Sequence, residues 1–481
     1  MAGAAPWRLF PIPSESLQTL WPHSNEVREM AEVEILNSDL QAGWCTRLFA
    51  KVGLDLRLFY IAVPRAKGDL IGVPAHVAAA IVAIICEAIS TATSSVGIFI
   101  LLTATLLRAP ALAPSWKQMF SQTWVKLLLV WIAWMALSIT WSPDVTKGID
   151  RLGALKFFIW IPMLWPLHKQ WRWLFAGFLL SALVLQGIQV AGAFGATHQG
   201  ETLIKGLRHP TVVGEWNAMA LSCWLFLAVS VGWRAMALCI PLAILSSIGF
   251  VWAGQRGALF GIVVEIVVAN IVLLFAVRGW LRKVLIRLLI SVIVIGGVYV
   301  VFGEGLSAKI KILWVEGMKS VGVNVDSGPV QIQSNESITS EERIAMWKMS
   351  MIAWRAHPII GVGYGGYSKA TQNIDDVVCP NFDIHQYDQP HSVYVMILTE
   401  NGLVGLTLFL VWSGAFFVRA FKAVQRDPIR IGVFGGAVIW YAAAVGDSFH
   451  TREMFLVVGV IMMALAAMPV ESSAESVDTA H

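Results

Sequence analysis

The sequence predicts an all-α polytopic membrane protein with about 12 transmembrane helices and one large extracytoplasmic loop that carries a short amphipathic helix. Three observations predict this fold class. Hydrophobic residues make up 57% of the 481 residues, charged residues only 14%, and the mean hydropathy is +0.67. Apolar runs recur at close to the roughly 20 residues that a helix needs to cross a hydrocarbon core of about 30 Å. These runs do not fit the alternating strands of a membrane β-barrel.

Charge and cysteine content narrow the classes of partner. The net charge is +4, and the basic residues lie in short clusters between apolar runs. Nucleic acid is therefore not an expected partner. The 5 cysteines are scattered, without the spacing of a disulfide framework or a CxxC site. We expect no cofactor and no metal.

Residues 1–70 differ from the rest of the chain because they are polar. An acidic patch is followed by a basic one, and no signal-peptide core precedes a cleavage site. The segment from Trp44 to Ile61 has the pattern of an amphipathic helix that lies on a membrane surface. We expect residues 1–70 to form a polar cytoplasmic region.

Transmembrane helices are predicted in two groups, with nine over residues 71–302 and three over 392–469, followed by a cytoplasmic tail at 470–481. The predicted spans are 72–89, 92–107, 123–140, 152–167, 173–194, 216–232, 235–253, 257–277, 284–302, 393–418, 430–446 and 454–469. The pair that ends at residue 107 is short enough to be a re-entrant element.

The orientation follows from Lys and Arg, which mark the cytoplasmic ends of membrane helices. They gather in alternate connections: Arg65 and Lys67; Arg108, Lys117 and Lys126; Lys169 and Arg172; Arg234; Arg278, Arg282, Lys283 and Arg287; Arg419, Lys422, Arg426 and Arg430. All of these clusters fall on one side of the predicted bundle. The opposite, extracytoplasmic face then carries the connections near 141–151, 195–215, 254–256, 303–391 and 447–453.

The large extracytoplasmic loop, 303–391, is too long to be a simple connection, and loops of this size are usually functional. Its segment from Ser340 to His357 places Ile344, Trp347, Met351 and Trp354 at helical spacing. Pro358 and Gly361 then end the helix. We expect a short amphipathic helix along the outer membrane surface.

Four residues on the extracytoplasmic face are candidates for chemistry. His391 ends the large loop just before a predicted span, and a histidine side chain can take or give a proton near neutral pH. Arg208, Arg256 and Arg343 lie in or beside the extracytoplasmic loops. A guanidinium group is suited to phosphate because it keeps its charge and donates two parallel hydrogen bonds. Together these residues suit a diphosphate leaving group on a membrane-anchored substrate.

Each candidate also has an ordinary structural interpretation. Arg256 can end a helix and extend to the membrane interface, and Arg208 and Arg343 can be solvated loop residues. His391 can simply cap the helix that follows it. The nearby acidic loop contains Asp375, Asp376, Asp383, His385 and Asp388, but its spacing matches no established metal-ligand pattern. A solvated loop is favoured there.

These residues resemble the superfamily of O-antigen ligases and Wzy-type polymerases, which act in bacterial envelope glycan transfer. The similar patches, in chain order, are Arg208 with Asn217-Ala218-Met219-Ala220; Gln255-Arg256-Gly257-Ala258; Arg343-x-x-x-Trp347 with Pro358-x-x-Gly361-x-Gly363; and His391-Ser392 with Glu400-x-Gly402-x-x-Gly405. They extend over about residues 75–467 and are specific only in combination. Ser392 departs from the usual Asn and Gln255 from the usual Ser, and neither change removes a charged group.

The resemblance implies a metal-independent glycosyltransferase in the bacterial inner membrane, with its active face toward the periplasm. The donor would be a glycan on undecaprenyl diphosphate, and the acceptor a hydroxyl of lipid A core. His391 would act as general base on the acceptor hydroxyl or orient it, while Arg208, Arg256 and Arg343 bind the diphosphate, with Asn217 and Glu400 in supporting roles. Membrane lipids would surround the protein.

Two alternatives stay open. A Wzy-type polymerase of O-antigen or exopolysaccharide repeat units would use the same donor and site, and a long loop directly before His391 only modestly favours the ligase. A transporter of lipid-linked glycan belongs to another class. A transporter should show broken helices or paired polar groups near the membrane midplane, where the sequence offers mainly Glu265 as an ionisable residue. A polar residue satisfied by a neighbouring helix is the simpler interpretation of Glu265.

Overall fold

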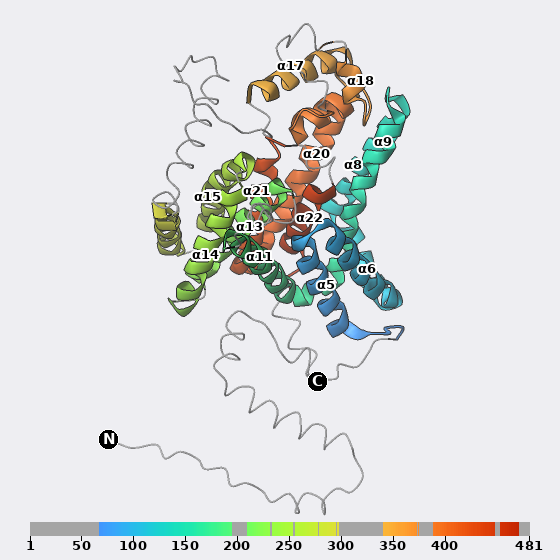
Figure 1. The fold of residues 1–481 in the computed structure, drawn as a ribbon. Helices are drawn as coiled ribbons and strands as arrows, with labels where there is room; N and C mark the ends of the chain where they lie inside the picture. The colour runs from blue at the N-terminus through green and yellow to red at the C-terminus, as the bar shows by residue number, and fades with distance from the viewer. Residues whose placement is uncertain are drawn as a thin grey trace, which may run out of the picture. The chain divides into compact units, whose positions relative to one another are not determined.

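The computed structural model describes residues 67–194, 209–230, 233–253, 255–277, 279–294, 296–297, 340–372, 374, 388–447 and 453–470. These residues belong to one compact unit, Arg65–His481. All their regular elements are helical, and no strand occurs among them. The predicted polar region up to residue 66, Arg208, the loop residues 301–339 and the acidic loop residues 375–387 lie outside the described part (Figure 1).

The helices follow one another along the chain with few long breaks. They are α5 (Gly72–Ile89), α6 (Thr91–Leu107), α7 (Ala109–Ser121), α8 (Thr123–Ser138), η1 (Ile139–Trp141), α9 (Val145–Leu152), η2 (Gly153–Ile159), α10 (Trp160–Leu164), η3 (Trp165–Gln170), α11 (Trp171–Phe194), α13 (Pro210–Ser230), α14 (Trp233–Ala253), α15 (Arg256–Ala276), α17 (Ser340–Ala356), α18 (Tyr367–Thr371), α20 (Val393–Arg426), η4 (Pro428–Arg430), α21 (Ile431–Ala443) and α22 (Glu453–Ala467). A further helix covers 281–294.

Seven helical stretches in the described part are long and apolar enough to cross a membrane, and the bent pair α6 and α7 would make eight if it counts as one span. The predicted count of about 12 is therefore not confirmed. The predicted spans 152–167 and 173–194 run together as one stretch, Val145–Phe194. Pro166 has no backbone N–H, and the chain kinks at Leu167, whose backbone angles are not helical (φ −94°, ψ 15°). The helices over 428–443 and 456–467 are apolar but shorter.

Helices α13, α21 and α22 form the core of the bundle. All residues of α21 are buried, and so is every residue of α13 from Thr211 to Ala228. Helices α14, α15 and α11 pack around α13 and α21, while α5 packs on α6 and α11 (Figure 1). A helix that is apolar on all sides is typical of such a central position.

An aromatic cluster holds α20 against α8. The rings of Trp131 and Trp412 stack with centroids 5.2 Å apart, and Phe158 of η2 meets both edge-on. Phe409 and Tyr441 extend the cluster to α21. Such aromatic pairs add about 0.5–1.5 kcal/mol each beyond the area that they bury. The cluster fixes the helix that begins just after His391.

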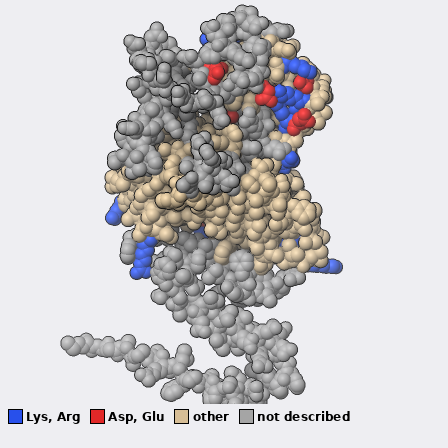
Figure 2. All heavy atoms as spheres, viewed as in Figure 1, with Lys and Arg blue, Asp and Glu red and all other residues tan. Residues whose placement is uncertain are grey.

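Charged side chains gather at the two ends of the bundle. Figure 2 shows a band of uncharged surface between them, with Lys and Arg along its lower edge and both signs of charge at the upper right. At one end Arg172 pairs with Asp427 at 3.3 Å, and the Arg430 guanidinium lies 4.4 Å from the centre of the Trp171 ring. Two of the basic clusters predicted for one face therefore meet. Lys147 and Arg151 lie at the other end, with Asp388.

Arg287 does not occupy the surface position that its basic cluster predicts. It is 1% exposed and forms an ion pair with Glu265, which also accepts a hydrogen bond from Ser222 at 2.7 Å. Glu265 is thus satisfied by neighbouring helices, as its simpler interpretation predicted. The rule that places Arg outside the bilayer counts charges along the chain and does not detect a partner on another helix.

Helix α17 ends one residue before the predicted His357. The residues of the predicted apolar series, Ile344, Trp347, Met351 and Trp354, are all half-buried. The fully buried positions are the neighbouring Ala345, Met346, Met349, Ser350 and Ala353. α17 packs against α20 and α18, above the start of α20 in Figure 1. Its small and flexible residues therefore face the protein, and its large apolar residues flank that contact.

Candidate active site

His391 sits in a turn that is anchored on both sides. Its backbone φ is +49°, which side-chain-bearing residues seldom adopt, and the residue is 8% exposed. On one side, the indole N–H of Trp347 donates to the carbonyl of Pro390 at 2.9 Å. On the other, the Val393 N–H lies 2.9 Å from the Ala444 carbonyl. Strained residues persist where the surroundings determine their conformation.

The chain after α21 brings a carboxylate to this histidine. His391 Nδ1 lies 3.6 Å from Asp447 Oδ1, and the Asp447 carbonyl also accepts from the Val393 N–H at 3.0 Å. Ser392 caps α20 by accepting a hydrogen bond from the Val395 N–H at 3.4 Å. The imidazole is thus placed beside a carboxylate at the beginning of a helix.

Two of the predicted arginines approach the same segment. A Cβ atom added at Gly446 would lie 3.8 Å from Nη1 of Arg343. A Cβ atom at Gly257, next to Arg256 at the start of α15, would lie 3.5 Å from the Ala443 carbonyl. Residues 443–447 therefore form a meeting point for the histidine turn, α17 and the start of α15. The Arg256 side chain and all of Arg208 lie outside the described residues.

Asn217 and Glu400, the predicted supporting residues, are both fully buried. The Asn217 amide donates to Gln189 at 3.1 Å and accepts from Gln186 at 3.2 Å. Gln186 also donates to Ser246 at 2.6 Å. This network joins α11, α13 and α14 inside the bundle, where hydrogen bonds between polar side chains help to fix helix register.

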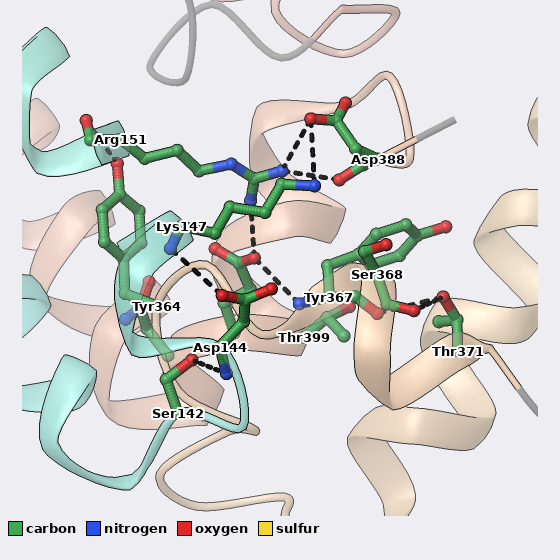
Figure 3. A network of polar contacts seen from close by, with 12 residues as sticks. Ser142, Asp144, Lys147, Arg151, Tyr364, Tyr367, Ser368, Thr371, Asp388 and Thr399 are labelled. Atoms are coloured by element: carbon green, nitrogen blue, oxygen red, sulfur yellow. Dashed lines mark hydrogen bonds and ion pairs between the residues drawn. The ribbon is translucent and has the colours of Figure 1, made fainter. Parts of the chain in front are cut away.

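Glu400 belongs to a network of charges that Figure 3 shows from close by. The guanidinium of Arg151 lies 2.8 Å from Glu400 Oε1, 2.6 Å from the Asp388 carbonyl and 3.5 Å from the Asp388 carboxylate. Lys147 lies 3.2 Å from the same carboxylate. Glu400 Oε1 also accepts from the Tyr367 N–H at 3.1 Å. Helix α9 is thereby tied to α20 and to the chain just before His391.

The glycine motifs of the sequence meet at a break in α20. Gly402 has φ +65° and ψ −166°, so the helix hydrogen bonds across it are lost. The turn over residues 358–363 replaces them: Leu403 and Val404 donate to the carbonyls of Pro358 and Ile359 at 3.0 and 3.1 Å. In return, Val362 and Gly363 donate to the carbonyls of Thr399 and Glu400 at 3.0 and 2.8 Å. We call this arrangement, residues 358–363 with 399–404, the glycine clasp.

The glycine clasp also requires close backbone contact with the α8–α9 corner. Gly363 has φ +94°, and a Cβ atom there would lie 2.5 Å from the Ser142 Cα. The Ser138 hydroxyl accepts from the Tyr364 N–H at 3.2 Å and from the Asn401 amide at 2.7 Å. Burial, with the nearby Glu400 carboxylate, raises the pKa of Tyr364. The phenol therefore stays neutral at physiological pH.

Several residues of this region were missed by the sequence reasoning. Lys147 and Arg151 fall in the predicted extracytoplasmic connection 141–151, so the argument applied to Arg256 also pointed to them. Asp447 opens another predicted extracytoplasmic connection. Glu215 is completely buried, neither of its carboxylate oxygens has a hydrogen-bond partner among the described residues, and it interacts electrostatically with Asp447. Its position in an apolar run gave no signal beyond its charge.

No group of three or more His, Cys, Asp or Glu side chains among the described residues is arranged to hold a metal ion. The acidic residues Asp375, Asp376 and Asp383, with His385, lie outside the described part. The described groups of the site are an imidazole, carboxylates and guanidinium groups. Such groups can transfer a proton and bind an anion.

Residues 241–410 match a protein-family model, Wzy_C, whose description is O-antigen ligase. No curated protein matches the chain. The matched segment runs from α14 into α20 and includes Arg256, Arg343, His391 and Glu400. The predicted resemblance is thereby confirmed. Members of this family are membrane glycosyltransferase-like enzymes, either ligases or polymerases.

Proposed function

We propose that this protein transfers a glycan from undecaprenyl diphosphate to a hydroxyl of lipid A core. The match of residues 241–410 to the O-antigen ligase family model supports this proposal. The reaction would take place at the periplasmic face of the bacterial inner membrane. One observation carries the proposal: His391, paired with Asp447, lies where α17 and the start of α15 also meet.

In the proposed mechanism His391 is the general base. Asp447 faces Nδ1, and we assign to Nε2 the role of receiving the proton of the acceptor hydroxyl. The acceptor oxygen forms a bond to the anomeric carbon, the bond from that carbon to the diphosphate oxygen breaks, and the hydroxyl proton passes to Nε2. Asp447 stabilises the imidazolium that results. Attack opposite the leaving group inverts the anomeric centre.

The arginines would stabilise the departing diphosphate. Arg343 approaches residues 443–447 from α17, and Arg256 opens α15 beside Ala443. We propose that both guanidinium groups, with Arg208, neutralise charge that develops as the bond to the diphosphate breaks. The energy for transfer comes from the diphosphate linkage of the donor, so no nucleotide is required.

The test is transfer to lipid A core in membranes of a glycan-deficient host that expresses the full chain. His391→Ala is expected to lower transfer by about 100-fold or more, since general bases contribute about 10²–10⁴. His357→Ala is the matched control because His357 is exposed at the end of α17. Expression of each variant is checked by immunoblot.

Other outcomes would replace the proposal. If His391→Ala transfers glycan as well as His357→Ala does, the mechanism is wrong. If the wild type lengthens the lipid-linked glycan and adds nothing to lipid A core, the protein is a polymerase. If it moves the lipid-linked glycan across the bilayer without forming a glycosidic bond, it is a transporter.

A further inference from the structure

We propose that Arg151 is a positioning residue for His391: it ties residues 388–392 to α20 and so holds the imidazole beside Asp447. The proposal rests on the proposed function for the catalytic role of His391. The placement itself follows from the contacts of Arg151, which lies on α9, far from His391 in the sequence.

The Arg151 side chain is 7% exposed, so its charge requires partners inside the protein. It has two kinds. The Glu400 carboxylate, with no exposed surface, lies 2.8 Å from Nη1. The Asp388 carbonyl accepts from Nη2 at 2.6 Å. A planar guanidinium fork reaches both acceptors at once, whereas a lysine ammonium is a single point of charge.

The two partners lie on either side of the histidine. Asp388 precedes His391 by three residues in the sequence, and Glu400 lies in the first turns of the helix that follows. Gln389 between them is 2% exposed. One guanidinium group therefore fixes the distance between the chain that enters the histidine turn and the helix that leaves it.

The backbone of His391 gives this restraint its importance. With φ at +49°, the turn is in a conformation that a histidine adopts only when its surroundings impose it. Loss of Arg151 removes the donor to the Asp388 carbonyl and leaves Glu400 with no cation within ion-pair distance among the described residues. We expect residues 388–392 to relax, and His391 to move from Asp447.

The test compares four full-length variants in detergent or nanodiscs. Arg151→Gln removes the charge, and Arg151→Lys keeps the charge but not the fork. Asp388→Asn keeps the carbonyl that Arg151 binds. Lys369→Met is the matched control, because Lys369 is 53% exposed and pairs with Asp144. The readouts are kcat and donor KM, and the rate at which diethylpyrocarbonate modifies His391, followed by peptide mass spectrometry with His357 as internal reference.

Arg151→Gln is expected to lower kcat by about 10- to 100-fold with donor KM within about twofold, since a small misplacement of a reacting group costs this much. In the same variant, diethylpyrocarbonate is expected to modify His391 several times faster than in the wild type, while the rate of modification of His357 stays the same. Arg151→Lys falls between Arg151→Gln and the wild type, and so does Asp388→Asn, which loses the ion pairs of the Asp388 carboxylate with Arg151 and Lys147 but keeps the carbonyl contact. Lys369→Met matches the wild type in both readouts.

The proposal is overturned if Arg151→Gln keeps wild-type kcat, or if its His391 remains as protected as in the wild type. If Arg151→Gln does not fold, Arg151→Lys decides: wild-type protection of His391 together with wild-type kcat rejects the positioning role. The protection readout is independent of activity. An inactive wild type would therefore reject the proposed function without removing the test of Arg151.

Discussion

Glu215 is a buried carboxyl group whose oxygens have no hydrogen-bond partner in the part of the chain that the structure describes, although it lies within electrostatic reach of Asp447. Glu265 is equally buried but paired with Arg287 and Ser222. A buried polar group without a partner costs the folded state about 1–3 kcal/mol, whereas a paired one offsets most of that cost. The same substitution is therefore expected to have opposite effects at the two positions.

Glu215→Leu is expected to raise the free energy of unfolding by about 1–2 kcal/mol, because it removes a desolvated carboxyl group and leaves no partner behind. Glu265→Leu is expected to lower it by about 3–5 kcal/mol, because Arg287 is left as an unpaired buried charge. Denaturant unfolding of the purified protein in one detergent measures both. A destabilised Glu215→Leu would show that the carboxyl group has a partner in the membrane.

Asp144 is the clearest pH-sensitive residue outside the spans. Its carboxylate caps α9 by accepting from the Lys147 N–H at 3.1 Å. That hydrogen bond, with the nearby Lys369, holds the pKa of Asp144 below its usual value of 3.8. Since the folded-state pKa is depressed, the cap stabilises fully above about pH 4 and is lost as the pH falls through the folded-state pKa.

Asp144→Ala is accordingly expected to cost about 1 kcal/mol of unfolding free energy at pH 7. The difference from the wild type shrinks toward zero below the folded-state pKa, where the wild-type carboxyl group is protonated. Thermal unfolding over a pH series measures this convergence. A constant difference down to the lowest pH at which the protein is soluble would contradict the capping role.

At the scale of elements, the glycine clasp explains why two glycine motifs distant in sequence occur together. Gly402 breaks α20, and the turn over 358–363 supplies the hydrogen bonds that the break removes. In a membrane helix such groups need internal partners, since lipid offers none. A Cβ atom at Gly402 would also collide with the Ile359 carbonyl.

Gly402→Ala is expected to lower the free energy of unfolding by at least about 2 kcal/mol, through strain at positive φ and loss of the clasp. Gly414→Ala is the matched control in the same helix. Nothing lies within 4 Å of a Cβ atom at Gly414, so this change is expected to be neutral or to stabilise by up to about 1 kcal/mol. Equal unfolding midpoints for the two variants would argue against the clasp.

The elements were predictable where one local signal determined them. Helix α5 has the predicted bounds 72–89, and α17 ends one residue before the predicted end. The stretch Val145–Phe194 was predicted as two spans, 152–167 and 173–194, because Lys169 and Arg172 between them indicated a cytoplasmic connection. The clasp was not predictable, since neither glycine motif indicates which backbone groups the other one satisfies.

The residues of the candidate site were also predictable only in part, where a local feature of the sequence indicated them. A histidine before an apolar helix is visible in the sequence, as are arginines in extracytoplasmic connections, and these features are the basis for the prediction of His391 and Arg343. The pairing of His391 with Asp447 depends on how α20 packs on α21. The contact of Arg151 with Glu400 depends on how α9 packs on α20. Tertiary packing decided these partners, and no spacing along the chain encodes them.

At the scale of the whole molecule, the Glu265 pair links α15 to the helix over 281–294, and Ser222 extends the link to α13. Both charged side chains are 1% exposed. Paired ionisable groups inside a bundle are what the transporter alternative requires. A pair that only joins helices can be replaced by apolar residues, whereas a pair that moves a proton or an ion cannot.

The double variant Glu265→Leu with Arg287→Met is expected to recover most of the stability that Glu265→Leu loses, because no unpaired charge remains. It is also expected to keep wild-type glycan transfer. A double-mutant cycle of unfolding free energies, with the transfer assay on the same samples, measures both. Recovered stability without transfer would assign the pair a functional role.

The glycine clasp also constrains how the protein matures. The second half of α20, after Gly402, can form as an ordinary helix when it enters the membrane. The first half, which begins just after His391, lacks hydrogen-bond partners for its last carbonyls until residues 358–363 dock on it. We therefore expect the first half of α20 to be completed only when residues 358–363 dock at its Gly402 end. Under the proposed function, a newly inserted chain is expected to be inactive until that docking takes place.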